Sequence, residues 1–354
     1  MDDRHVNEVH LVMNDQRAMT VSVAELPGGD NVIYTAHLTR VVDRLSKVYS
    51  GFNSSDVSKS NPIQTKDYIV NKITCTISDR VSVNEVVVTN LKEEWNRTII
   101  ELKCNLHCLD GFKNEVCSDL KKHDAADDRM DLNTGRDCCA ANFLYGLSKM
   151  KTKGNMDIDG FQTFLHKNGI RPSEIPRFVG NRWNLLFYMS GLVIKYQSKF
   201  FYYLFNWCKL KNSKARDNLK WGINNAHLLK QFRALGFISK VCTTPWMKLF
   251  YSNKDRLSNV AMVPHMKLFA ANLDEYIANP KSLTTTTIDA FDDTIEVDDT
   301  LTALRVGDWC EEMDFLAGLI LQAIHKVLHR QCERYAFCKN YFQKLLYHKT
   351  CLFI

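Results

Sequence analysis

Apolar and polar residues alternate in an order that predicts an α/β region at the start of the chain. Two β-prone runs flank a polar turn and predict a hairpin, and two later apolar runs each follow a segment with apolar residues at helical spacing. Strands are predicted at 9–13, 19–26, 73–77 and 102–106, and helices at 31–49 and 82–98. The resulting order is strand, strand, helix, strand, helix, strand.

After Asp110 the pattern changes to one of long helices. Helices are predicted at 137–150, 159–168, 184–208, 213–237 and 262–278. Residues 289–299 are dense in carboxylates, which is typical of a flexible acidic linker or an exposed loop. The last helical pattern, 302–347, has one broad apolar face formed by Trp309, Met313, Leu316, Leu319, Ile320, Ile324, Val327 and Leu328.

These patterns predict an α/β plus α protein in four parts. They are an α/β region at 1–110, a large α-helical region at 111–282, an acidic linker at 283–300 and a C-terminal helical segment at 301–354. A chain of 354 residues is long enough for this division.

The N-terminal sequence, the apolar stretches and the net charge limit the classes of protein to which this chain can belong. The chain opens MDDRHVNEVH, without the apolar run of a secretory signal, so we expect its 12 cysteines to be reduced thiols. The longest apolar stretch, 183–207, is interrupted by Lys195 and Lys199, which argues against a membrane span. The net charge of +6 is compatible with a polyanionic partner without requiring one.

A Cys-x-x-His element, Cys104 to His107, is a candidate start of a zinc site. Zinc is usually held by two close pairs of ligands, and the later candidates, Cys117 with His123 or Cys138 with Cys139, are poorly spaced. We therefore interpret Cys104 and His107 as packing residues and predict no metal.

Basic residues interleave with aromatic ones between positions 182 and 220, as in nucleic-acid-binding proteins. The alternative interpretations are a buried helix start at 182–183 and a solvated helix face at 195–220. The candidate DNA-binding residues are Arg182, Trp183, Lys195, Lys199, Lys209, Lys211, Lys214 and Arg216.

Three stretches in order resemble the hAT superfamily of DDE transposases. They are Ile73–Asn84 (ITCTISDRVSVN), Leu102–Asp110 (LKCNLHCLD) and Ile175–Met189 (IPRFVGNRWNLLFYM). The resemblance implies a ribonuclease-H-like fold with an α-helical insertion. It also implies that Asp79 corresponds to the second catalytic Asp, a metal ligand.

The departures from that family imply an incomplete sheet and an inert protein. The family's first catalytic Asp lies on a central strand before the hairpin, and its third acid lies in a C-terminal element; neither has a counterpart here. One carboxylate cannot hold Mg²⁺ usefully, so Mg²⁺ is expected only if a longer form supplies the missing acids. Within this chain we favour the interpretation of Asp79 as a helix N-cap beside the capping-box pattern Ser82-x-x-Glu85.

We expect a catalytically inert, transposase-derived protein that binds DNA in the nucleus rather than being secreted. The alternatives are a cytoplasmic helical scaffold, whose 302–347 face forms a homo-oligomer or binds a protein partner, and a fragment of a longer active transposase. The ending Cys351–Ile354 has the form of a C-a-a-X prenylation signal, a pattern common by chance. Without a central strand, we expect residues 1–110 to pack loosely or to borrow another segment.

Overall fold

The computed structural model divides the chain into two compact units. Unit 1 comprises Met1–His107, Ser258–Val260 and Arg334–Ile354, and unit 2 comprises Cys108–Leu257 and Ala261–Glu333. The predicted boundary near residue 110 is close to the first division, but the predicted segment 301–354 is shared between the units. The structure describes residues 4–12, 18–27, 30–53, 62–78, 82–103, 107–126, 137–150, 158–178, 184–208, 214–251, 259–345 and 350–353.

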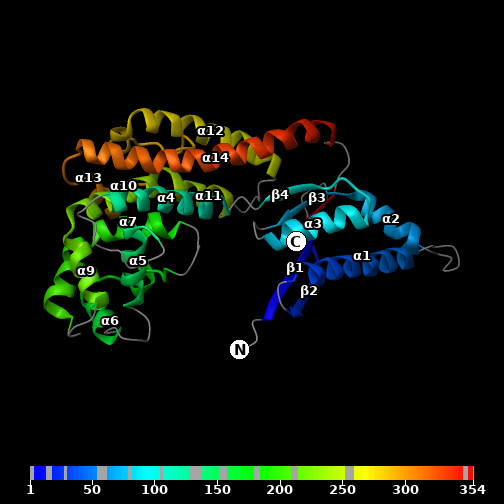
Figure 1. Cartoon of the computed structure of the whole chain (residues 1–354), viewed down its shortest axis with the longest axis horizontal. Coiled ribbons are helices and arrows are strands. Elements are labelled where there is room, and N and C mark those ends of the chain that lie inside the picture. The colour runs from blue at the N-terminus through cyan, green and yellow to red at the C-terminus, as the bar shows by residue number, and fades with distance from the viewer. Residues whose placement is uncertain are drawn as a thin grey trace. The chain divides into compact units, whose positions relative to one another are not determined.

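Unit 1 is built around a five-stranded sheet of order β2-β1-β5-β3-β4 (Figure 1). β1 pairs antiparallel with both β2 and β5, whereas β3 is parallel to both β5 and β4. The predicted hairpin and the predicted strand at 73–77 are both present. The strands are β1 (Arg4–Val12), β2 (Ala18–Pro27), β3 (Ile73–Ser78), β4 (Ile100–Lys103) and β5 (Thr350–Phe353).

The central strand of this sheet is supplied by β5, from the far end of the sequence. Leu352 pairs with Leu11 of β1 on one side and with Thr76 of β3 on the other. A borrowed segment between the hairpin and the strand at 73–77 was one of our two expectations, and the pairing confirms it. β5 includes three of the four C-a-a-X candidate residues, which were not predicted as a strand because so short a run carries no alternation.

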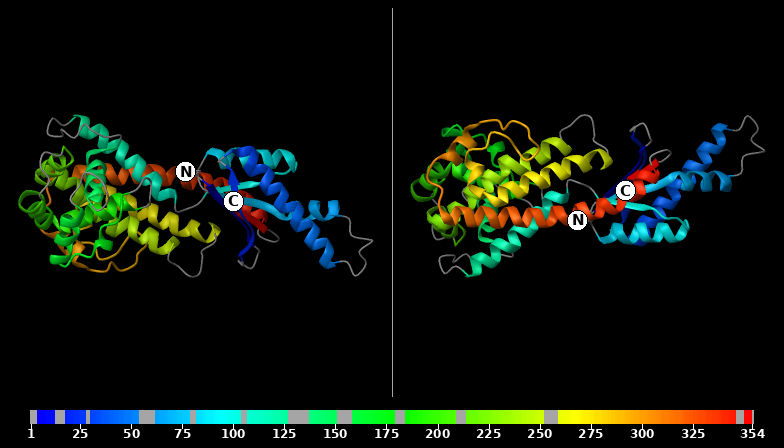
Figure 2. Two further views of the ribbon diagram at one scale, coloured as in Figure 1. Left: turned by 90° about the horizontal axis from the view of Figure 1, so that it is seen from below. Right: turned by 90° about the horizontal axis from the view of Figure 1, so that it is seen from above.

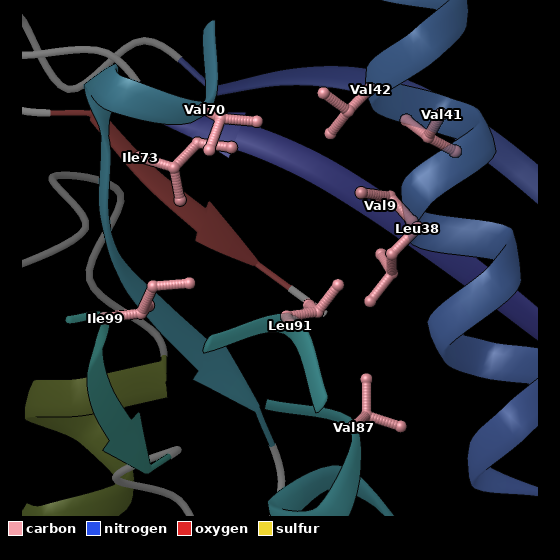
Figure 3. Packing of buried hydrophobic residues seen from close by; sticks show 9 residues of the cluster. All are labelled: Val9, Leu38, Val41, Val42, Val70, Ile73, Val87, Leu91 and Ile99. Atoms are coloured by element: carbon pink, nitrogen blue, oxygen red, sulfur yellow. The ribbon is translucent and has the colours of Figure 1, made fainter. Parts of the chain in front are cut away.

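Three helices pack on the sheet of unit 1, where their apolar side chains form one cluster (Figure 3). Thr39 of the first helix donates to Glu94 of the third at 3.1 Å, so these two helices lie side by side. The cluster consists of Val9, Leu38, Val41, Val42, Val70, Ile73, Val87, Leu91 and Ile99. The helices are α1 (Asn31–Asn53), α2 (Pro62–Lys72) and α3 (Ser82–Glu94), of which α2 was not predicted.

Unit 2 is mostly helical over its described residues and has no strand there apart from one isolated bridge between Ile288 and Thr294. The predicted helices at 184–208 and 213–237 are each divided into shorter ones. Its helices are α4 (His107–Ala126), α5 (Cys139–Lys149), α6 (Ile158–Lys167), η1 (Pro172–Glu174), α7 (Leu185–Lys195), α8 (Gln197–Tyr202), η2 (Tyr203–Trp207), α9 (Lys214–Asn224), α10 (Ala226–Ile238), η3 (Ser239–Thr243), α11 (Thr244–Tyr251), α12 (Asn259–Ala278), η4 (Pro280–Thr284), α13 (Asp299–Arg305) and α14 (Glu311–Leu345).

Helix α4 was missed because its many charged residues conceal a narrow apolar stripe. Leu109, Phe112, Val116 and Leu120 follow one another at helical spacing, and each is fully buried. Phe112 lies edge-on to Trp246 of α11, with ring centroids 5.4 Å apart, and Trp246 is itself fully buried. Burial of each such side chain contributes roughly 1.5–3 kcal/mol to the free energy of folding.

The acidic stretch 283–300 belongs to unit 2 and is not a linker, which corrects the predicted division of the chain. The alternative of an exposed loop fits its carboxylates, since Asp292, Asp293, Glu296 and Asp299 are exposed, but its apolar residues are packed. Leu283 and Ala290 are fully buried, and the Phe291 ring lies 5.1 Å from that of Phe269 in α12. The Asp289 carboxylate accepts hydrogen bonds from the backbone N–H groups of Phe291 and Asp293. These hydrogen bonds hold a tight turn, and burial raises the pKa of Asp289 in spite of them.

The apolar face predicted in 302–347 is an internal surface of unit 2 over the part the structure describes. Met313, Leu316 and Ile320 are buried to within 1%. α14 lies beside α12 (Figure 2), and His325 of α14 is 3.2 Å from Asp274 of α12. This face is therefore not available to a partner helix, and the scaffold alternative loses the surface on which it depended.

The expectation of no membrane-spanning helix and the expectation of reduced cysteines have different outcomes. No helix in the described part of the chain combines the length and the apolarity that a membrane crossing requires, in agreement with the absence of a predicted span. Seven described cysteines are reduced and outside any disulfide, whereas Cys75 of β3 is in a disulfide, so the expectation of a fully reduced chain is wrong there.

Candidate nucleic-acid interface

The candidate catalytic acid lies just beyond the described end of β3. Asp79 and Cys104 fall outside the described residues; His107 begins α4. β3 ends at Ser78, and its neighbour β5 is parallel to it, with Phe353 opposite Ile77. Asp79 therefore follows directly from the strand beside the central strand.

The DNA-binding residues predicted from sequence are only partly described. Arg182, Trp183, Lys209 and Lys211 fall outside the described residues. Lys214 is an exposed residue at the start of α9.

The other three candidates make contacts within unit 2. Lys195 lies 3.5 Å from Asp299, and Lys199 donates to the carbonyl of Asn168 at 2.9 Å. Arg216 donates to the carbonyl of Leu204 from its Nη2, at 3.3 Å. Their first role is to fix the loops and helix ends around α8.

A tyrosine between α7 and α8 shows how firmly this region is held. Tyr196 donates its hydroxyl hydrogen to Glu174 at 2.7 Å, and Lys195 and Lys199 both lie against its ring. Burial and the bond to Glu174 raise the pKa of Tyr196, and the bond from Tyr196 lowers the pKa of Glu174. These contacts join η1 to the junction between α7 and α8.

The opposite face of α8 and η2 presents exposed aromatic rings, which we call the aromatic platform: Phe201, Tyr202 and Phe205. They are 40%, 52% and 37% exposed, whereas the neighbouring Phe200 and Tyr203 are buried. The rings of Phe201 and Phe205 are stacked with centroids 4.5 Å apart. Because their neighbours fill the core, the platform rings face solvent.

A basic helix and a shallow pocket adjoin the platform. Lys220 of α9 lies over the Phe205 ring, with its Nζ 4.8 Å from the centroid. A pocket of about 380 Å³ is lined by Phe205, Lys220, Trp221, Asn224 and Asn225. An unpaired base could stack on the Phe205 ring, with the side-chain amides of the pocket at the edge of the base. The ammonium group of Lys220 would then lie near a phosphate.

The sequence indicated the aromatic and basic content of this region but not which rings are exposed. The predicted basic residues Lys195 and Lys199 make internal contacts, and Lys220, which was not selected, lies on the platform. A strict helical projection of 197–207 would not have separated the faces, because η2 is a π-helix that changes the angular position of Phe205.

A second group of polar side chains, in the interior of unit 2, has the residue types that bind transition metals. A ring nitrogen from each of His123 and His227 and a carboxylate oxygen of Asp124 lie within 4.8 Å of one another. Asp124 and His227 are both buried.

Comparison with known proteins finds no matching family model, no matching curated protein and no matching solved structure. The fold and the site therefore define the class only as a two-unit protein, with a small mixed sheet in one unit and helices in the other. The feature best suited to a ligand on its described surface is the aromatic platform with Lys220.

Proposed function

We propose that this chain is a catalytically inert relative of the hAT-superfamily transposases that binds DNA through the aromatic platform, with unpaired bases stacked on its rings. We also propose that the protein acts in the nucleus. Stacking needs only a π-face, so recognition would be tolerant of sequence.

The order of strands in unit 1 supports the relationship. A ribonuclease-H-like sheet of the kind implied by the resemblance has its central strand between the hairpin and the strand that precedes the second catalytic Asp. β5 occupies that position, antiparallel to β1 and parallel to β3. Asp79 follows β3, as the resemblance requires.

The composition of the central strand supports the absence of catalysis. β5 has the sequence TCLF and carries no carboxylate, whereas the family's first catalytic Asp lies on its central strand. Two-metal chemistry depends on several carboxylates that together hold the ions. The alternative, a fragment of a longer active transposase, predicts Mg²⁺-dependent DNA cleavage that is lost in Asp79→Asn.

One observation carries the binding proposal: the stacked pair of Phe201 and Phe205 with Lys220 over its edge. Exposed single aromatic residues are ordinary on protein surfaces, but a stacked pair leaves two rings in water together. Helix α9 adds three basic residues, Lys214, Arg216 and Lys220, against one acid, Asp217. The positive balance favours a polyanion over an apolar partner.

The test is binding of a fluorescent single-stranded oligonucleotide to the full chain across a range of salt concentrations. We expect affinity to fall as salt rises, and Phe205→Ala with Lys220→Glu to weaken binding by about tenfold or more, since one stacked base contributes about 1–3 kcal/mol. An affinity that does not depend on salt would contradict the proposal.

Unit 1 offers a matched control. Tyr49 and Tyr68 form another exposed stacked pair, with centroids 6.0 Å apart, and Lys72 lies over the Tyr68 ring. We expect Tyr68→Ala with Lys72→Glu to leave binding unchanged within twofold. If this control variant loses binding while the platform variant keeps it, the assignment of the surface is wrong.

A further inference from the structure

The polar group between α4 and α10 combines residues far apart in sequence. His123 and Asp124 lie near the end of α4, and His227 and Gln231 lie one turn apart in α10. The His123 and His227 rings are nearly parallel, with centroids 5.1 Å apart. Their nitrogens and the Asp124 carboxylate converge within 4.8 Å.

Hydrogen bonds from neighbouring residues orient His227 and Asp124, as is usual for side chains that bind a metal ion. The Nδ1 of His227 is hydrogen-bonded to Glu312 of α14, which places the lone pair on Nε2. That lone pair accepts from the Gln231 amide at 3.3 Å, a contact that the ion would replace. Lys230 also donates to Glu312, so the carboxylate is held between Lys230 and His227. Such a carboxylate–histidine pair fixes the ring and increases its basicity.

The Asp124 carboxylate is held on both oxygens. Its Oδ2 accepts from the backbone N–H of Cys139 at 2.8 Å, and its Oδ1 accepts from the Gln231 amide at 2.7 Å. Each oxygen keeps further lone-pair capacity, because a carboxylate accepts about four hydrogen bonds.

Two buried atoms in the same group lack partners among the described residues. They are Nδ1 of His123 and Oε1 of Gln231. A finished hydrogen-bond network would satisfy both, since an unsatisfied buried polar atom costs about 1–3 kcal/mol. A metal ion bound to the first atom, with a water that donates to the second, would satisfy both at once.

We propose that His123, Asp124 and His227 bind one Zn²⁺ ion, with water as the fourth ligand. Two imidazoles, a carboxylate and a water are a ligand set that zinc accepts in tetrahedral geometry. Zinc bonds of about 2.0–2.2 Å require the ligand atoms to lie roughly 3.3–3.5 Å apart, so the side chains move by about 1 Å on binding. The ion ties the end of α4 to the start of α10.

The test uses the full chain, stripped with a chelator and titrated with Zn²⁺ alone. We expect one tight site and a higher melting temperature with metal, because an ion that binds only the folded state stabilises it. His123→Ala and His227→Ala should weaken binding at least 100-fold. No tight site, or unchanged binding in both variants, would overturn the proposal.

A milder variant keeps the test decisive if the alanine variants do not fold. Glu312→Gln retains the size of the side chain that binds His227 and removes only its charge, and loss of such an outer contact typically lowers metal affinity 10–100-fold. Unchanged affinity in this variant would contradict the assigned role of His227.

Two further measurements separate this site from other ligands in the chain. His325 and His329 of α14, with Asp274 near His325, have the same residue types on the surface, so His325→Ala should leave the tight site intact. Co²⁺ in place of Zn²⁺ should give an absorption spectrum without thiolate charge transfer. A thiolate band, or loss of the site in His325→Ala, would place the metal elsewhere and overturn the proposal.

Discussion

At residue scale, Asp298 links the start of α13 to the neighbouring helical core through two bonds. Its Oδ1 accepts from the backbone N–H of Leu301 at 2.9 Å, and its Oδ2 accepts from Lys240 at 2.5 Å. Although burial raises the pKa of Asp298, these two bonds lower it below its ordinary value of 3.8. The ionised form is therefore the one that stabilises the fold.

We expect Asp298→Ala to lower the free energy of unfolding by about 1 kcal/mol at pH 7, as loss of a helix cap does. Because the pKa of Asp298 is lower in the folded chain, its contribution is complete above about pH 4 and is lost as the pH falls through the folded pKa. The difference between the two proteins should thus shrink in acid. Chemical denaturation at pH 7, 5 and 3 measures it.

The neighbouring residue provides the control. Asp299 is 87% exposed and makes only a 3.5 Å contact to Lys195, so Asp299→Ala should cost a few tenths of a kcal/mol. An equal loss in both variants would mean that general helix electrostatics, and not the cap, explains the effect.

At the scale of elements, α7 and α10 approach so closely that glycines face each other. A Cβ on Gly236 would lie 3.0 Å from the Cα of Gly191 and 2.7 Å from Leu304 of α13. A Cβ rarely lies as close as 3.0 Å to backbone, and the Leu304 methyl group would also have to move, so the close crossing depends on the absence of a side chain. Three helices meet at this point.

We expect Gly236→Ala to destabilise unit 2 by about 1–3 kcal/mol, in spite of the better helix propensity of alanine, because overpacking forces the helices apart. Gly318→Ala in α14 is the matched control, since its Cβ would meet only Pro280 at 3.8 Å. Removing a helical glycine there should stabilise by up to about 1 kcal/mol. Thermal unfolding of both variants tests this prediction. A Gly236→Ala variant with a higher melting temperature than the unmodified protein would contradict the close crossing.

At the scale of the whole molecule, the sequence order and the spatial order of the sheet differ. Unit 1 contains the start and the end of the chain, because β5 lies between β1 and β3. Residues 1–107 alone would leave the facing edges of these two strands without their central partner. The two units should therefore differ in how they respond to a change in β5.

We expect Leu352→Pro to disrupt unit 1 and to leave unit 2 folded. Proline lacks the N–H that a central strand donates and is excluded from such positions, and each unsatisfied buried group costs about 1–3 kcal/mol. Hydrogen exchange should accelerate in β1 and β3 but not in α7 or α10, and Leu352→Val should preserve protection. Unaltered protection of β1 and β3 in the proline variant would mean that β5 is dispensable.

The sequence by itself determined the local elements whose pattern is strong. The hairpin, the β-branched strand at 73–77 and the helices predicted at 137–150, 159–168 and 262–278 follow from side-chain periodicity, which is a property of neighbouring residues. The expectation of a missing central strand came from the resemblance to the transposase family and not from periodicity. The hAT relationship and DNA binding remain predictions.

Only the tertiary structure decided which segments meet. The choice of β5 as the central strand, the packing of the apolar residues of the stretch 283–300 and the exposure of the platform rings depend on contacts between residues distant in sequence. The same holds for the group of His123, Asp124 and His227, because a hundred residues separate α4 from α10 and no short motif spans them. Local periodicity fixes which face of an element is apolar, whereas long-range packing selects the partner that covers it.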